Sequence, residues 1–350
     1  AAPGRDGVER FAVPDVALYI NGQLTFDNIH FREASQFTSV SILGTTRNIA
    51  LAPGTSTSIN DTFFSINTTL IPTNKYMIVS NGMKSNVGFT PYKKFSLDIY
   101  SNAKNHAQNP SNIDVLFFHG CTDGTILDAR LGIKTFADDV SYGQFSNGYT
   151  AFPAVDGKVR LTNTTGKVNL YNFSLAFNSL GLTSKAITVV SSGFINPAAN
   201  NNGPAFGLYF ATEAGGPLQP LPPTTAEAIA RLQLIQNSAD SAADFLDVYV
   251  GNDLFVDNLP FRNSTTYLDV IASVPSSIGI APKNSTSVAD VLHTAAIAFD
   301  SGAIYIGGIN GIISPSGYTP APGRKTRFYK GGKEAASTPS NTDMLLVHGI

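Results

Sequence analysis

The most restrictive feature of this chain is an internal repeat with a period of roughly 110 residues. Residues 16–32 align without gaps with residues 246–262, and residues 127–142 form a looser middle copy. The outer two copies share Tyr19/Tyr249, Leu24/Leu254, Asp27/Asp257, Asn28/Asn258, Phe31/Phe261 and Arg32/Arg262. A second block recurs at 49–58, 159–165 and 278–287, and an apolar run ending in glycine recurs at 76–82, 186–193 and 303–308. Self-similarity at a fixed period indicates tandem domains.

Within each copy, apolar and polar residues alternate over short runs separated by Asn, Gly, Pro and Ser. This alternation predicts half-buried strands of antiparallel sheets, and about seven such strands per copy fit a two-sheet sandwich. We therefore predict an all-β fold of three tandem immunoglobulin-like antiparallel β-sandwich domains. Their expected bounds are 1–109, 110–228 and 229–340, followed by an orphan opening strand at 341–350. Residues 226–230 are predicted to form one turn of helix before a strand.

Charge and composition argue against several classes of function. Charged residues make up 14% of the chain and the net charge is −2, with neither Lys nor Arg clustered, so no nucleic-acid partner is expected. No apolar run approaches the roughly 20 residues of a membrane span, so no membrane insertion is expected. The single cysteine, Cys121, rules out an intrachain disulfide and leaves a bacterial surface protein open.

The C-terminal decapeptide repeats an interior segment. Residues 340–349 share Ser, Asn, Asp, Leu, His and Gly with residues 111–120, which open the second copy. The third copy opens with a strand at 232–237, whereas the corresponding residues 2–7 have no strand pattern. We therefore expect the first domain to lack its opening strand and the C-terminal segment to be a spare one. A sandwich missing a strand exposes unpaired backbone groups unless another strand fills the gap.

Two interpretations of the spare strand remain open. In one, it completes the first domain of the next molecule by β-augmentation, which gives a head-to-tail homo-polymer. In the other, it begins a fourth domain of a longer repeat protein. Alternation predicts that one of two residue sets faces a core, whichever interpretation holds. The assembly strand consists of Asp343, Met344, Leu345, Leu346, Val347 and His348, and the two sets are Met344/Leu346/His348 and Asp343/Leu345/Val347.

The histidines and the cysteine do not form the pattern of a catalytic or zinc site. His30, His106, His119, His293 and His348 are scattered along the chain. His119 and His348 occupy equivalent positions where the third copy has Gln236, so we interpret this position as a structural hydrogen bonder. Cys121 lacks the third partner that a nucleophile requires.

The acidic and glycine-rich motifs are also interpreted as structural. The recurring pairs 27–28, 138–139 and 257–258 are expected to cap turns, and residues 307–311 are expected to form a turn. Asp123 with residues 200–203 is the candidate calcium site, although the spacing of an EF-hand loop is absent. We predict no catalytic residues, no cofactor and no metal site.

The repeats resemble a bacterial family of secreted tandem β-sandwich modules (domain of unknown function 4397). The resemblance rests on Phe118-His-Gly-Cys-Thr-Asp123 and on Leu246-Asp-Val-Tyr-Val250. The third copy departs from the motif at 235–240, where Gln replaces the His. The resemblance implies an extracellular or cell-surface location and supplies no catalytic residues.

These observations favour a non-enzymatic, extracellular structural protein, the subunit of a cell-surface fibre, stalk or filament. The alternative is a binding module, an adhesin whose loops recognise a surface glycan. Rows of exposed aromatic residues would favour the adhesin, whereas the Phe and Tyr residues here mostly occupy alternating core positions. An enzyme is the third and least favoured option.

Overall fold

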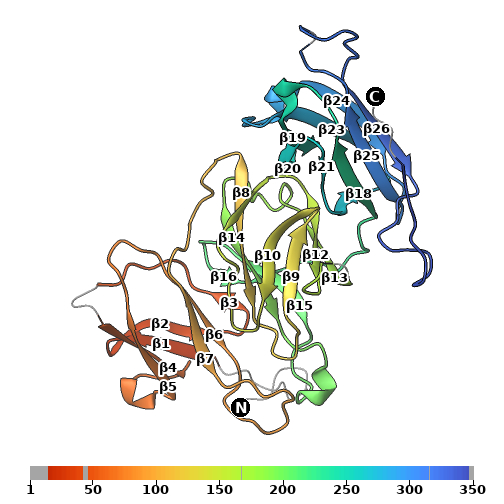
Figure 1. Cartoon of the computed structure of the whole chain (residues 1–350). Coiled ribbons are helices and arrows are strands. Elements are labelled where there is room, and N and C mark those ends of the chain that lie inside the picture. The colour runs from red at the N-terminus through yellow and green to blue at the C-terminus, as the bar shows by residue number, and fades with distance from the viewer. Residues whose placement is uncertain (1–14, 42–45, 167, 315, 347–350) are drawn as a thin grey trace. The chain divides into compact units, whose positions relative to one another are not determined.

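The computed structural model describes residues 15–41, 46–166, 168–314 and 316–346 (Figure 1). These residues form β-strands and short 3-10 helices without an α-helix, which confirms the predicted all-β class. The chain divides into two compact units, Ala1–Ala226 and Glu227–Ile350. The first unit holds the first two repeats and the second unit holds the third. No helix within the described residues has the length and apolar character of a membrane span.

The first repeat has a four-stranded sheet of order β2-β1-β4-β5 and a two-stranded sheet that pairs β6 with β7. Ile49 and Leu51 of β4 pack with Leu97 of β7 in one hydrophobic cluster, which joins the two sheets. The elements are β1 (Val16–Ile20), β2 (Gln23–Ile29), β3 (Glu33–Ala34), β4 (Thr46–Pro53), η1 (Ile59–Asp61), β5 (Phe64–Thr69), β6 (Met77–Asn81) and β7 (Ser96–Tyr100).

The second repeat pairs a sheet of order β10-β9-β12-β13 with a sheet of order β11-β8-β14-β15-β17. Residues from both sheets, among them Phe117, Leu161 and Val189, form one buried core. The elements are β8 (Asn112–His119), β9 (Leu127–Leu131), β10 (Lys134–Val140), β11 (Thr150–Pro153), β12 (Gly157–Thr162), β13 (Asn169–Leu175), β14 (Ala186–Ser192), η2 (Pro197–Ala199), β15 (Gly207–Ala211), β16 (Gly216–Pro217) and β17 (Gln219–Pro220).

The third repeat has the same plan, with sheets of order β20-β19-β23-β24 and β21-β18-β25-β26. Leu232, Val248 and Ile280 are among the residues that form its core. The elements are β18 (Ile229–Gln236), η3 (Ser241–Ala243), β19 (Phe245–Val250), β20 (Asp253–Pro260), β21 (Asn263–Ser264), β22 (Leu268–Ile271), β23 (Pro275–Pro282), η4 (Val288–Asp290), β24 (His293–Ala298), β25 (Ile304–Asn310) and β26 (Lys325–Lys330).

The opening strand of each complete repeat lies inside its sheet and pairs in parallel with a later strand. β8 pairs in parallel with β14, and β18 pairs in parallel with β25. The two sheets that contain β8 and β18 are therefore mixed, whereas the other sheets of the described residues are antiparallel as predicted. In β8, all residues from Ile113 to His119 are buried. A strand covered on both faces carries a continuous apolar run, which explains the sequence Val-Leu-Phe-Phe at 115–118.

The segment after the second repeat is not a free linker. β16 pairs with β3 of the first repeat and β17 pairs with β15 of the second. The Leu218 N–H also donates to the Arg32 carbonyl at 2.7 Å. Residues 215–223 therefore belong to the first unit. The predicted turn of helix at 226–230 is wrong, because β18 begins at Ile229.

A glycine with positive φ follows the equivalent strands β6, β14 and β25. Gly82, Gly193 and Gly311 have φ angles of +82°, +92° and +89°. A Cβ atom at these positions would lie 2.4, 2.3 and 2.4 Å from the carbonyl oxygen of a facing residue. In the third repeat, the sequence pattern predicted that the strand ends at Gly308 and that residues 307–311 form a turn. Both expectations are wrong, since β25 continues to Asn310.

The recurring Asp/Asn pairs form bulges within strands, not turn caps as predicted. Asn28, Asp139 and Asn258 have φ angles of 50°, 47° and 54° inside β2, β10 and β20. The Asp139 N–H donates to Asp128 Oδ1 at 2.8 Å, and the Asn258 N–H donates to Asp247 Oδ1 at 2.9 Å. In the second and third repeats, a carboxylate on the neighbouring strand thus accepts the N–H that the bulge removes from the ladder.

Candidate functional site

β8 shows what an opening strand does in this fold. It lies between β11 and β14, with Val115 opposite Ile187 and Phe117 opposite Val189. Val115 and Phe117 belong to the buried core between the sheets. Phe118 faces the other side, where its ring centroid lies 4.6 Å from that of Phe145. Both faces and both edges of an opening strand are therefore in use.

The edge of β6 has no such strand within the described residues. β6 pairs with β7, with Met77 opposite Tyr100 and Val79 opposite Asp98. β14 pairs with β15 in the same register, shifted by 111 positions, and its other edge carries β8. Residues 2–7, the counterpart of the opening strand in which the sequence shows no strand pattern, lie outside the described residues. An exposed strand edge presents unpaired N–H and C=O groups to another chain.

The C-terminal segment does not form the predicted orphan strand in this structure. Residues 341–346 have no regular secondary structure. Met344 and Leu346 are 92% and 91% exposed, and Leu345 is 49% exposed. Val347 and His348 of the predicted assembly strand lie outside the described residues. A strand forms only where a second backbone accepts and donates its hydrogen bonds, and no described strand pairs with 341–346.

Asp343 closes a clip just before the exposed apolar residues. Its Oδ2 atom accepts from Lys333 Nζ at 2.8 Å and from the Ser337 N–H at 2.9 Å. The hydrogen bond from Lys333 is the main reason that the pKa of Asp343 falls to about 2. The same arrangement lies at the start of β8, where Asp114 Oδ2 accepts from Lys104 Nζ at 2.6 Å and from the Gln108 N–H at 3.2 Å.

All three positions of the clip are related by a shift of 229 residues. Sequence reasoning missed Lys333 and Ser337, although the recurrence of Lys104 as Lys333 was visible. The segment that leads to Met344 therefore has the same local hydrogen bonds as the segment at the start of β8.

His119 makes the structural hydrogen bonds expected of it. Its buried ring places Nε2 2.8 Å from the Thr125 carbonyl and Nδ1 3.0 Å from Ser191 Oγ. Because a carbonyl can only accept, Nε2 carries the proton and Nδ1 accepts from the hydroxyl. Burial lowers the pKa of His119, which favours this neutral form. In the third repeat Gln236 takes the position and donates to the Ala243 carbonyl at 2.5 Å.

Asp123 and Asn200, the candidate calcium ligands, do lie together, but through hydrogen bonds. Asp123 accepts from the Ile195 and Asn196 N–H groups at 2.8 Å each and from Asn200 Nδ2 at 3.2 Å. Cys121 is buried beside this carboxylate, and burial raises the pKa of its thiol to about 12. Among the described residues no three His, Cys, Asp or Glu side chains are grouped as a metal site requires.

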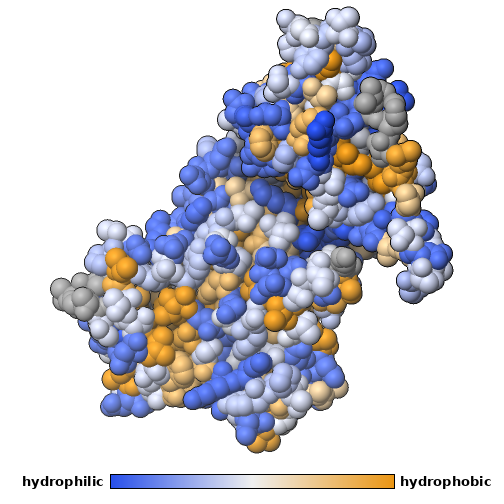
Figure 2. Space-filling view, viewed as in Figure 1, coloured by the Kyte–Doolittle hydropathy of each residue, from blue (hydrophilic) through white to orange (hydrophobic). Residues whose placement is uncertain are grey.

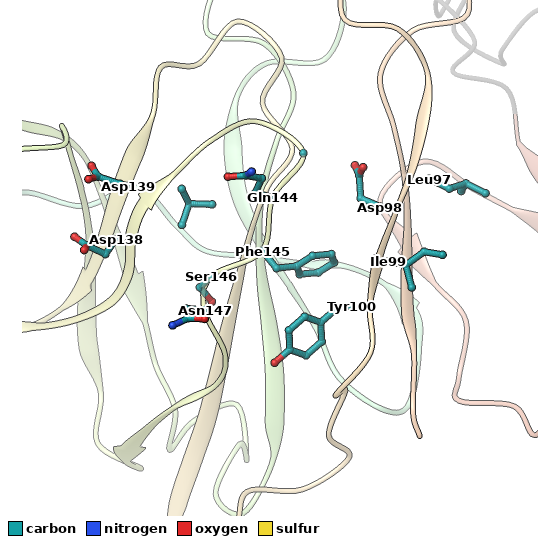
Figure 3. Close-up of a pocket in the computed structure, with 12 residues that line it drawn as sticks. Leu97, Asp98, Ile99, Tyr100, Asp138, Asp139, Gln144, Phe145, Ser146 and Asn147 are labelled. Atoms are coloured by element: carbon teal, nitrogen blue, oxygen red, sulfur yellow. The ribbon is translucent and has the colours of Figure 1, made fainter. Parts of the chain in front are cut away.

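A cavity of about 640 Å³ lies between β7 and the second repeat (Figure 3). It is lined by residues 97–100, 138–140 and 143–147. The Tyr100 and Phe145 rings face each other with centroids 5.3 Å apart. Asp98 is half-buried, and this burial raises its pKa although Asn81 Nδ2 and Ser96 Oγ donate to it at 3.4 and 3.3 Å. No motif in the sequence indicated this cavity.

The visible surface in Figure 2 mixes hydrophilic and hydrophobic residues over both units. The exposed large apolar residues are spread over many loops and strands, as in Val87, Val155 and Leu292. Isolated exposed apolar residues of this kind are ordinary and do not mark a binding surface.

Comparisons with known proteins give distant structural likenesses, among them a carbohydrate-binding module and a candidate cell adhesion protein. No family model and no curated protein sequence matches the chain. A family-26 carbohydrate-binding module of Eubacterium rectale Amy13K, solved with maltoheptaose, is 10% identical with a TM-score of 0.18 and covers 64% of this chain and 98% of its own. A candidate cell adhesion protein from Bacteroides eggerthii is 9% identical with a TM-score of 0.15 and covers 65% and 97%. At these TM-scores neither likeness decides a ligand or partner of this chain.

Proposed function

We propose that this protein is a non-enzymatic structural protein of the bacterial cell surface, whose tandem sandwiches form the subunit of a fibre, stalk or filament by strand donation. The observation that carries the proposal is the β6 edge. Within the described residues this edge is unpaired, whereas β8 covers the equivalent edge of β14. Residues 341–349 of a neighbouring molecule would occupy it. The contact is head-to-tail, so it repeats without limit unless the rotation closes a ring.

The register of β8 can be transferred to the donated strand. A shift of 229 positions places Met344 and Leu346 where Val115 and Phe117 enter the core of the second repeat. Leu346 then stands opposite Ile78, as Phe117 stands opposite Val189. This register selects the set Met344/Leu346/His348 as the one that faces the core. Asp343, Leu345 and Val347 take the opposite face.

A polar pair supports this register. His119 stands opposite Ser191 and accepts a hydrogen bond from it at 3.0 Å. The same shifts place His348 opposite Ser80, an exposed residue of β6. In the third repeat both members differ, and Gln236 stands opposite Ile309. The C-terminal segment therefore carries the residue that suits a serine on the accepting strand.

Exposed apolar surface supplies the driving force. Burial of the Met344 and Leu346 side chains, both more than nine-tenths exposed in this structure, contributes about 1.5–3 kcal/mol each. Part of this gain offsets the cost of ordering the segment and of association. The backbone hydrogen bonds along β6 add to it and fix the direction of the strand.

A truncated chain and a peptide test the donation. A chain lacking residues 340–350 keeps the β6 edge and loses the donor, so it should remain monomeric by sedimentation velocity while the full chain associates with rising concentration. A synthetic peptide of residues 340–350 should bind the truncated chain, and the same peptide with Leu346→Asp should not, because a carboxylate would enter the core. If the truncated chain associates like the full one and ignores the peptide, strand donation is wrong.

A cross-link tests the register. Ser80→Cys in one preparation and His348→Cys in another should form an intermolecular disulfide on mild oxidation, since the two positions are predicted to be opposite. Gly349→Cys is the matched control, because neighbouring residues of a strand point to opposite faces. The native Cys121 is buried and does not compete. Equal cross-linking at 348 and 349 would contradict the proposed pairing.

A further inference from the structure

The first two repeats pack on each other through an arginine. Arg32 of the first repeat lies at the end of β14 and the start of β15, where Nε donates to Ser192 Oγ at 3.2 Å and Nη2 donates to the Ala205 carbonyl at 2.8 Å. Its guanidinium also lies 4.1 Å from the centre of the Tyr209 ring. The second repeat therefore has a built receptor for a guanidinium group.

The first repeat has the same receptor position. Gly82 corresponds to Gly193, and the bridge Met83–Lys94 corresponds to the bridge Phe194–Ala205. With this shift of 111 positions the residues of the second repeat that bind Arg32 have counterparts at the end of β6 and the start of β7. Ser192, Ala205 and Tyr209 correspond to Asn81, Lys94 and Asp98. A carboxylate thus takes the place of the aromatic ring, and both groups attract a guanidinium.

Equivalent loops also meet each other across this interface. The Thr90 N–H donates to Asn200 Oδ1 at 3.0 Å, and Asn201 Nδ2 donates to the Val87 carbonyl at 3.0 Å. The rings of Phe89 and Phe194 stack with centroids 5.8 Å apart. The interface between the two repeats is therefore approximately reciprocal.

Gly143 is the reciprocal counterpart of Arg32. Each follows an aromatic residue, Tyr142 or Phe31, and their φ angles are 77° and 58°. Arg262 of the third repeat, with φ of 59°, shows that this backbone position accepts arginine. A Cβ atom at Gly143 would lie 3.4 Å from Asp98 Oδ2. Gly143 of the second repeat thus lies beside Asp98 of the first repeat, but it has no side chain that could supply a guanidinium group.

The cavity of about 640 Å³ lies where that side chain is absent, with Asp98 and Gly143 in its lining. Within the described part of the chain Asp98 forms no ion pair, and its hydrogen bonds come from the neutral Asn81 and Ser96. The nearby Tyr142 hydroxyl is buried and has no hydrogen-bond partner among the residues that the structure describes. Asp138 and Asp139 also line the cavity, and Lys93 Nζ lies 5.5 Å from the centre of the Tyr142 ring.

We propose that this cavity binds the guanidinium group of an arginine side chain presented by a peptide or protein partner, with Asp98 as the charged acceptor. The carboxylate and the planar cation match in geometry, as two parallel N–H···O bonds require. The Tyr100 and Phe145 rings line the same cavity and suit the flat face of the cation.

Titration of the full chain with L-argininamide, followed by NMR of backbone amides, tests the site. The expected result is saturable shifts at residues 97–100 and 143–147, and binding at least about tenfold weaker for L-lysinamide, which cannot bond through a planar fork. Asp98→Asn should weaken argininamide binding by about tenfold or more, because the charge is lost while the shape is kept. Asp253→Asn, on the third repeat, is the matched control and should bind as the parent does.

A second variant lets the chain fill its own site. Gly143→Arg should raise the thermal midpoint of the first unit and abolish argininamide binding. Gly143→Ala adds no guanidinium, so it should neither raise the midpoint nor abolish binding. Binding that is unchanged by Asp98→Asn, or an absence of shifts at these residues, would overturn the proposal. Because truncation of 340–350 leaves this site intact, its outcome is separate from that of the strand-donation tests.

Discussion

Arg32 and Tyr209 belong to different repeats, yet the guanidinium lies 4.1 Å from the ring centre and donates to the carbonyls of Ser192 and Ala205. Burial lowers the pKa of Arg32. An arginine guanidinium nevertheless stays charged in proteins. Through these contacts with two carbonyls and a ring, the Arg32 cation stabilises the interface between the two repeats. Arg32 and its repeat counterpart Arg262 also contact the preceding phenylalanine, with 4.9 Å to the centre of the Phe31 ring and 5.0 Å to the centre of the Phe261 ring.

Arg32→Ala should loosen the first two repeats. Loss of the charged hydrogen bonds and the ring contact should lower the free energy of unfolding of the first unit by about 1–3 kcal/mol, measured by urea denaturation. Arg262→Ala removes the same side chain from the same backbone conformation, together with its contact with the Phe261 ring. It should cost less than about 0.5 kcal/mol. Equal effects of the two substitutions would show that Arg32 does not fasten the repeats.

His119 should make stability depend on pH. Its folded-state pKa is lowered by burial, so the unfolded chain binds the proton more readily. The stability contribution is complete above the unfolded pKa of about 6.5 and is lost as pH falls below it toward the folded pKa. His119→Gln, which copies Gln236, should keep most of the stability at pH 7.5 and lose less than the parent on going to pH 5. Thermal melts at the two pH values measure the difference.

His119→Leu separates hydrogen bonding from packing at this position. It leaves the Thr125 carbonyl and the Ser191 hydroxyl without their partner, so it should cost about 1–3 kcal/mol at pH 7.5. A leucine variant as stable as the glutamine variant would contradict a role in hydrogen bonding.

Asp240 should stabilise the third repeat through the same loop that Asp123 holds in the second. It accepts from the Ile313 N–H at 2.7 Å, the Ser314 N–H at 2.8 Å and the Ala242 N–H at 2.9 Å. Burial acts to raise its pKa, but these hydrogen bonds outweigh burial and the pKa is lowered. The contribution is therefore present above the unfolded pKa of about 3.9 and is lost as pH falls through the lower folded pKa.

Asp240→Asn should lower the free energy of unfolding of the second unit by about 1–3 kcal/mol at neutral pH, because an NH₂ group would face backbone donors. Asp253→Asn, an exposed aspartate of the same repeat, is the matched control and should be neutral within about 0.5 kcal/mol. Equal urea midpoints for the two variants would show that the loop does not depend on this carboxylate.

The sequence was sufficient for features that depend on one repeat alone. The identities between 16–32 and 246–262 correctly predicted matching strand pairs, now β1–β2 and β19–β20. The interchange of His119 and Gln236 correctly predicted a structural hydrogen bonder. Both inferences need only the period of a strand and the chemistry of one side chain. The parallel pairing of β8 with β14 was missed, because alternation reports the buried face of a strand and not its direction.

The cavity beside Asp98 was not predictable in this way. It depends on how the first repeat packs on the second, which brings Asp98 to Gly143 across 45 positions of sequence. Gly143 indicates a vacant guanidinium position only by comparison with Arg32, which occupies the equivalent position on the other side of the interface between the two repeats. The C-terminal clip is intermediate, since the recurrence of Lys104 and Asp114 as Lys333 and Asp343 was readable, but their contact was not.

Two glycines of the third repeat separate steric clash from backbone strain. Gly311 and Gly302 have φ angles of +89° and +73°, so alanine is strained at both. A Cβ atom at Gly311 would lie 2.4 Å from the Gly323 carbonyl oxygen, whereas nothing lies within 4 Å at Gly302. Gly302→Ala should therefore cost about 1 kcal/mol, and Gly311→Ala should cost at least about 2 kcal/mol more, as measured by urea denaturation of the full chain. Because Gly82 and Gly193 meet the same carbonyl contact, alanine at those positions should destabilise the first unit in the same order of magnitude. Similar losses for Gly302→Ala and Gly311→Ala would mean that the carbonyl contact does not constrain the end of β25.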